Sequence, residues 1–174
     1  MFDRPRTSLG ILALLLLLPQ TIYVIGDYLA VGIRFPFFRF QLASQSVSGY
    51  GNGTAGNLTV STITIMRELQ FISTGMVGKA LGKTAIATYV WLAALGVLIL
   101  AAVLVISWQF LENSGHARFP GPLILVAGGL FFVWGMVQYG PLLFSSSGYS
   151  IPVGLPVFLY IGYQFIQAAK EEGE

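Results

Sequence analysis

The sequence contains no cysteine, only one histidine and few charges, and each shortage excludes a class of protein. Without cysteine the chain can form neither disulfides nor thiolate metal sites. One histidine, His116, cannot build a histidine-rich metal centre. Charged residues make up 9% of the chain, against about a quarter in ordinary soluble domains, and 55% of the residues are hydrophobic. This composition indicates a membrane protein.

The scarcity of charge also bears on partners and chemistry. Nine basic and seven acidic residues are scattered thinly, with no basic stripe that could follow a nucleic-acid backbone. The sequence shows neither a nucleophile with a neighbouring base nor a pair of carboxylates in an apolar run. We therefore predict a protein that is not an enzyme, with no cofactor, no metal and no nucleic-acid partner.

Four apolar runs predict four membrane-spanning helices, at about 9–31, 84–108, 121–139 and 151–169. The second of these, "TAIATYVWLAALGVLILAAVLVISW", has no charge in 25 residues and is the clearest. The first is interrupted by Pro19, where we expect a kinked helix. The predicted fold class is an all-α membrane protein, a bundle of four transmembrane helices within a single domain, 1–174.

The segment at about 32–83 is the only sizeable part predicted outside the bilayer. "LTVSTITIM" is β-branched and partly alternating, and "SGYGNGTAGN" is a dense turn signal, so we expect a β-hairpin or small sheet. From 67 to 83 the pattern becomes helical and predicts a short helix that leads into the second span. Together these patterns predict a small β-rich outer segment between the first two helices.

Basic residues do not settle the orientation, because five lie on the long-loop side and four lie opposite. The long loop also carries two glycosylation sequons, at Asn52 and Asn57, which favour an outer location for it. With an even number of spans, both termini are then predicted in the cytoplasm and the protein in the cell membrane.

The stretch "GMVGKALGKTAIATYVW" resembles a phosphate-binding loop that leads into a helix, but its spacing is wrong. Counting back from Gly82, the first glycine of such a loop would stand at position 77, which is Val77. Gly78 and Gly82 are four residues apart, as on one face of a helix that a neighbouring backbone approaches closely. We predict packing at these glycines and no nucleotide site.

Asp27 is the one ionisable residue inside a predicted span, and such charges call for a named partner. Arg34, Arg39 and Arg67 are the candidates. One interpretation places Asp27 just beyond the hydrocarbon edge, against headgroups or the base of the loop. The alternative places it on an ion or proton path through the membrane.

Aromatic residues are unusually dense after the first predicted helix. Phe37 and Phe38 belong to a run of phenylalanines between 35 and 40, denser than an interfacial belt requires. This run is a candidate edge for lipid insertion or partner docking.

The order of elements resembles the claudin and peripheral-myelin-protein superfamily of four-helix membrane proteins. "YGPLLF" from Tyr139 and "FLYIGYQF" from Phe158 are similar to aromatic elements that flank the second outer loop of that family. The chain departs from the family in lacking its cysteine pair, and it has no tryptophan before Trp91. The resemblance implies a four-helix bundle with an outer sheet that acts by contacts with like molecules or a larger membrane partner.

We therefore predict a non-catalytic integral membrane protein that acts by lateral or cell-surface association. Its role would be that of a structural or adhesion-type protein, or an accessory subunit of a membrane complex, with the lipid bilayer and a homo-oligomer or larger complex as its partners. The alternative is a small ion channel or transporter with Asp27 near the pathway. A membrane-embedded enzyme is the third class.

Overall fold

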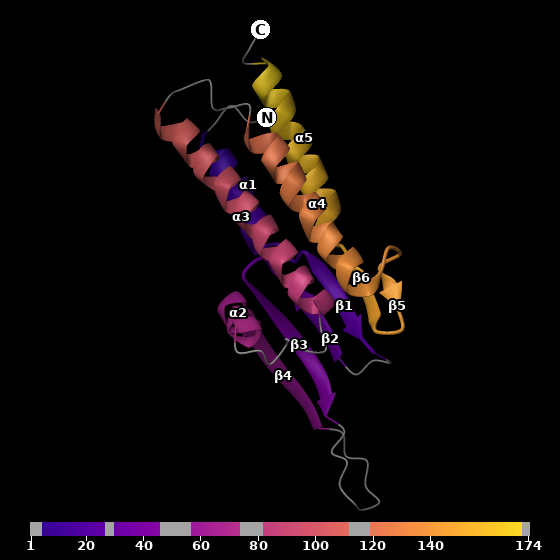
Figure 1. The fold of residues 1–174 in the computed structure, drawn as a ribbon. Helices are drawn as coiled ribbons and strands as arrows, with labels where there is room; N and C mark the ends of the chain where they lie inside the picture. Colours follow the sequence, from indigo (N-terminus) through magenta and orange to yellow (C-terminus); the bar gives the residue numbers. More distant parts are fainter. Residues whose placement is uncertain (1–4, 27–29, 46–56, 74–81, 112–118, 172–174) are drawn as a thin grey trace, which may run out of the picture.

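The computed structural model describes residues 5–26, 30–45, 57–73, 82–111 and 119–171. Within these ranges the chain forms five helices and one six-stranded sheet (Figure 1). The helices are α1 (Pro5–Leu17), α2 (Ile65–Ser73), α3 (Gly82–Leu111), α4 (Pro120–Tyr139) and α5 (Leu155–Glu171). The strands are β1 (Thr21–Ile25), β2 (Ala30–Arg34), β3 (Phe38–Gln45), β4 (Asn57–Thr64), β5 (Phe144–Ser145) and β6 (Gly148–Ile151).

The predicted fold class, an all-α bundle of four transmembrane helices, is wrong, because the described residues form a mixed α/β fold. Among these residues, two helical segments are long and apolar enough to cross a membrane, Thr84–Ser107 in α3 and Pro120–Tyr139 in α4. Helix α1 has 13 residues, short of the roughly 20 that a span requires, and α5 has 17, at the lower limit of the usual range. The claudin-like four-helix bundle is therefore not supported.

The predicted first span, 9–31, fails because its second half is β-structure. Helix α1 ends at Leu17, and proline at position 19 cannot continue a helix. The residues that follow, "TIYVI", are β-branched or aromatic and form β1. Gln20 is buried at the junction, where its side-chain amide donates to the carbonyl of Leu18 at 2.9 Å. That bond satisfies one carbonyl that the end of the helix leaves open.

The sheet joins two segments that are far apart in the chain. Its strand order is β4-β3-β2-β1-β6-β5, and every pair of neighbours is antiparallel. Strands β1 to β4 precede α3, whereas β5 and β6 come from the connection between α4 and α5. Ile22 of β1 pairs with Ile151 of β6, which attaches the last strand pair to the first. The sheet lies at one end of the long helices (Figure 1).

The helices form the main apolar core. Helices α3 and α4 lie side by side, with α5 against α4 and α1 near α3 and α5 (Figure 1). Trp91, Phe131 and Phe158 are among the buried side chains that fill the space between them. Helices α4 and α5 approach closely at Gly128, where an added Cβ would lie 2.6 Å from the Cβ of Phe158. Small residues permit this contact, as they do between membrane helices.

Two local predictions for the segment before α3 are confirmed. Strands β3 and β4 pair as an antiparallel hairpin, with Phe38 opposite Thr64 and Gln45 opposite Asn57. A helix, α2, follows β4 directly, as the change of pattern near residue 67 indicated. The predicted continuation of this helix over 74–81 lies outside the described residues.

Candidate functional site

Arg34 is a buried cation held between two tryptophans. It occupies the last position of β2, where alternate residues point inward, and only 4% of its surface is exposed. The guanidinium carbon lies 4.2 Å from the ring centroid of Trp91 on α3 and 4.7 Å from that of Trp134 on α4. Both distances lie within the roughly 6 Å over which a cation is attracted to an aromatic face. The sheet is thereby anchored to the helix pair.

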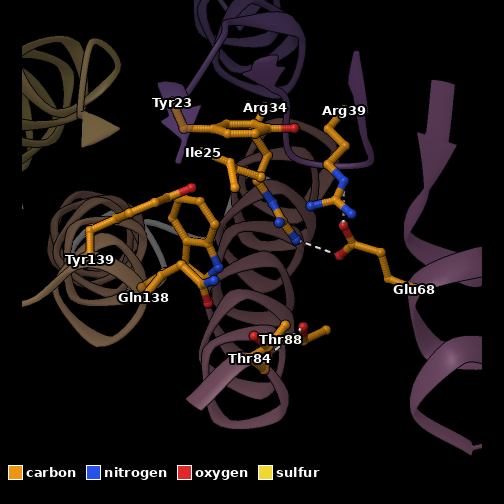
Figure 2. A pocket seen from close by; sticks show the side chains of 10 residues that line it. Tyr23, Ile25, Arg34, Arg39, Glu68, Thr84, Thr88, Gln138 and Tyr139 are labelled. Carbon is orange, nitrogen blue, oxygen red and sulfur yellow. Dashed lines mark hydrogen bonds and ion pairs between the residues drawn. The ribbon is translucent and has the colours of Figure 1, made fainter. Parts of the chain in front are cut away.

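Glu68 supplies the counter-charge from α2. Its Oε2 accepts a hydrogen bond from Nη2 of Arg34 at 2.5 Å, and its Oε1 lies 3.1 Å from Nε of Arg39. The second contact is an ion pair without hydrogen-bond alignment, so Nε of Arg39 is buried without an acceptor. Figure 2 shows both guanidinium groups turned toward the carboxylate. Two cations therefore share one anion.

Removal from water shifts the titration of this cluster. Burial lowers the pKa of Arg34 below its usual value, while the neighbouring carboxylate of Glu68 opposes that shift. Burial also raises the pKa of Tyr23, and the positive charges of Arg39 and Arg34 oppose the change. Desolvation is the largest effect on both side chains, which shows that they are removed from water.

The segment that carries both arginines is fixed by an indole hydrogen bond. Nε1 of Trp91 donates to the carbonyl of Pro36 at 3.0 Å, in the turn between β2 and β3. The Trp91 ring also contacts Phe131 and Trp134, at centroid distances of 4.5 and 5.2 Å. Because one tryptophan touches both Arg34 and this turn, the position of the arginine is set by the core.

A cavity of about 70 Å³ adjoins the cluster. Figure 2 shows its walls, which come from the sheet, α2, the first turns of α3 and the last turn of α4. Besides the charged groups it is lined by Tyr23 and by four further polar side chains, Thr84, Thr88, Gln138 and Tyr139. We call it the arginine cavity. It concentrates hydrogen-bonding groups at the junction of the sheet and the helices.

The face of the sheet turned away from this cavity is uncharged and mostly apolar. In the register of the strands, Val31 lies opposite Leu42 and Leu42 opposite Val60, while Ile33 lies opposite Phe40. We call this surface the apolar sheet face; its members are Ile22, Val24, Val31, Ile33, Phe38, Phe40, Leu42, Leu58, Val60, Thr62, Thr64, Phe144, Tyr149 and Ile151. None of them is charged. Val60 is 75% exposed and Phe144 is 70% exposed, so much of this face is in contact with solvent.

The structure brings some of the predicted site residues together and places others apart. Arg34 and Arg39 meet in the cavity, but their partner is Glu68. Phe38 belongs to a ring cluster, 4.8 Å from Phe35 between centroids, and Phe37 is exposed beside it.

Other predicted positions lie elsewhere or outside the described residues. Gly82 is exposed at the start of α3, and no described neighbour lies within 4 Å of an added Cβ there. Asn57 is the first residue of β4. Asp27, Gly78 and Asn52 lie outside the described residues.

Sequence reasoning missed Glu68 and the two tryptophans. The available signal was Glu68 itself, the one acidic residue between 28 and 111. A chain with so few charges and two arginines in one strand pair requires a nearby acid.

The residues that the structure describes include no group of three His, Cys, Asp or Glu side chains that could hold a metal ion. No family model, curated protein or solved structure matches this chain.

Proposed function

We propose that this protein is a non-catalytic membrane protein that acts by association, and that the apolar sheet face is the surface through which it associates. The observation that carries the proposal is the distribution of side chains on the sheet: its charged residues lie on the face turned toward the helices, and its other face carries no charge. Its arginines face the helices and α2, while most of the large apolar side chains on its uncharged face are exposed. Contiguous exposed apolar patches of a few hundred Å² usually mark interaction sites.

We propose that helices α3 and α4 lie within the lipid bilayer. Helix α3 contains an apolar segment of 24 residues, and α4 contributes 20. Many large side chains on these helices are exposed, among them Leu100 and Val103 on α3 and Val126 on α4. Lipid tails would cover these side chains, whereas the sheet, at the helix ends, would remain available to a protein partner.

A second copy of the chain is the partner that the surface fits best. An uncharged apolar face is complementary to itself, because two copies bring no like charges together. Sheets also pack face to face, about 10 Å apart, with interdigitated side chains. Strand spacing and rise give roughly 400 Å² of flat sheet per copy over β6 to β4. A pair then buries roughly 800 Å² of flat sheet, about two-thirds of the roughly 1,200 Å² at the lower end for stable interfaces.

Disulfide trapping would test this pairing, since the chain has no native cysteine. Leu42→Cys places one thiol near the middle of the apolar sheet face, and Thr59→Cys places one on β4 on the opposite face. Under mild oxidation in native membranes, we expect Leu42→Cys to give a covalent dimer and Thr59→Cys to give little.

Charge insertion provides the second test, with a matched control on the same strand. Val60→Lys introduces an ammonium into the apolar sheet face, whereas Thr59→Lys introduces it at an exposed position of the other face. Light scattering of detergent-solubilised protein should show a dimer for wild type and Thr59→Lys, and a monomer for Val60→Lys. A monomeric wild type, or crosslinks only to a different protein, would rule out self-association through this face.

A further inference from the structure

We propose that the arginine cavity binds a phosphate group. The first observation is its charge. Arg34 and Arg39 bring two positive charges and Glu68 brings one negative charge, so these three described side chains carry a net charge of +1, with the Arg34 side chain 5% exposed and that of Arg39 24% exposed. A buried charge without a partner is costly, and a bound anion removes that cost.

Hydrogen-bond donors remain for such an anion. A guanidinium has five N–H groups, and one of those on Nη2 of Arg34 donates to Oε2 of Glu68. Arg34 is 4% exposed, and its guanidinium lies at the wall of the cavity (Figure 2). Nε of Arg39 is buried and pairs with Oε1 of Glu68 at 3.1 Å, but among the described residues no acceptor is aligned for a hydrogen bond to it. Arginine is suited to phosphate because its planar fork presents parallel N–H groups.

A helix N-terminus adds a second, independent source of positive potential. Thr84 lines the cavity and lies in the first turn of α3, whose first residue is Gly82. The first N–H groups of a 30-residue helix have no intrahelical acceptor and carry the positive end of its dipole. Thr84 lines the same small space as Gln138 and Tyr139. Anions are commonly bound at such helix ends.

Size and position point to phosphate on a small or lipid-borne carrier. The cavity, about 70 Å³, is several times the roughly 10–15 Å³ that one water requires, but it is too small for a nucleotide. Its lining includes the first residue of one apolar segment, Thr84, and the last of the other, Tyr139. In a bilayer, this is the level of the phospholipid phosphates. The phosphate can therefore come from a lipid headgroup or from solution.

Paired ligands identify the group that is bound. Purified full-length protein in neutral detergent is titrated with phosphatidic acid, with diacylglycerol of the same acyl chains, and with inorganic phosphate. The readouts are tryptophan fluorescence, because Trp91 and Trp134 flank Arg34, and the thermal midpoint of unfolding. We expect phosphatidic acid, inorganic phosphate or both to bind saturably, while diacylglycerol does not. A response to phosphatidic acid alone identifies a lipid, and a response to inorganic phosphate identifies a soluble source.

Two arginine variants locate the site. Arg39→Gln removes a cation that is partly exposed at the cavity, and it leaves the Arg34–Glu68 pair in place. Arg67→Gln removes the same charge from an exposed position of α2 that does not line the cavity. We expect at least tenfold weaker binding for Arg39→Gln and less than a twofold change for Arg67→Gln. Equal binding of diacylglycerol and phosphatidic acid, no binding of either phosphate, or unchanged binding by Arg39→Gln would overturn the proposal.

Discussion

The two faces of the sheet are built in opposite ways. The helix-facing side carries Tyr23, Arg34, Arg39 and Gln41, whose side chains meet the arginine cavity or each other. The outward side carries none of the charges, and most of its large apolar side chains are exposed. Most half-buried sheets do the reverse, with the apolar face on the core. The comparison shows that the buried positions nearest the helices, on the inner face of this sheet, include charged and polar side chains that pair with one another, whereas the core between the helices is apolar.

The pairing register of the strands maintains this difference between the two faces of the sheet. Because side chains alternate along a strand, a slip of one residue in β2 would turn Arg34 outward and Ile33 toward Glu68. Such a slip would leave the carboxylate of Glu68 without its main partner. The inner face is therefore expected to tolerate little change, and the outer face to tolerate much. The predictions below compare the two.

The largest effect is expected from Glu68→Gln. The substitution removes the carboxylate that pairs with two arginines, one of them almost fully buried. Breaking a buried pair from one side costs about 3–5 kcal/mol in the free energy of unfolding. Reversible denaturation in detergent would measure the loss.

Two further variants test whether the lost charge causes the destabilisation expected for Glu68→Gln. Met66→Gln changes an exposed side chain on the same helix and should alter the free energy of unfolding by less than about 0.5 kcal/mol. The double variant Arg34→Met with Glu68→Met removes both charges of the main pair and should recover part of the loss. If the double variant is as unstable as the sum of its single variants, the ion pair does not explain the stability of this face.

A smaller effect is expected from Gly32→Ala. Gly32 of β2 lies opposite Tyr23 of β1, and an added methyl would overlap the end of the tyrosine ring and crowd the carbonyl of Phe40. Overpacking of this kind costs about 1–3 kcal/mol. The neighbouring outward position gives the comparison, since Val31→Ala removes two methyls from a half-exposed site. Denaturation curves in which Val31→Ala is the more damaging variant would contradict the contrast between the faces.

The smallest effect concerns alkaline pH. Because burial raises the pKa of Tyr23 in the folded state, the unfolded chain ionises first, near pH 10. The folded state then binds more protons above that pH, so the free energy of unfolding falls as pH rises, by up to about 1.4 kcal/mol per pH unit. Tyr23→Phe should reduce this fall. Unfolding measured at pH 8 and pH 11 would test it, and an identical slope for variant and wild type would contradict it.

Much of the helical part could be predicted from the sequence. The charge-free run at 84–108 and the run at 121–139 correspond closely to helical segments of α3 and α4, because nothing in them competes with a helix. The β3–β4 hairpin was also predictable, since its pattern is local and a dense turn signal separates the strands. Local signals were sufficient wherever the pairing partner is close in sequence.

The rest depends on contacts between distant residues. The run at 9–31 is apolar enough to predict a span, and only tertiary pairing reveals that β1 lies between β2 and β6. For the same reason Asp27, Arg34, Arg39 and Arg67 could be recognised as candidate charges, but not which of them would meet. The indole of Trp91 and the carboxylate of Glu68 reach Arg34 from different helices, which no spacing rule connects.

The position of β1 has a consequence for biosynthesis. Translation delivers β1 to β4 early, yet one edge of β1 pairs with β6, which is made only after α3 and α4. Until then the hydrogen-bonding groups of Thr21–Ile25 on that edge have no strand beside them. An open edge can pair with the wrong chain. The nascent protein therefore passes through a stage in which its sheet is incomplete, and the late hairpin of β5 and β6 closes it from the C-terminal side.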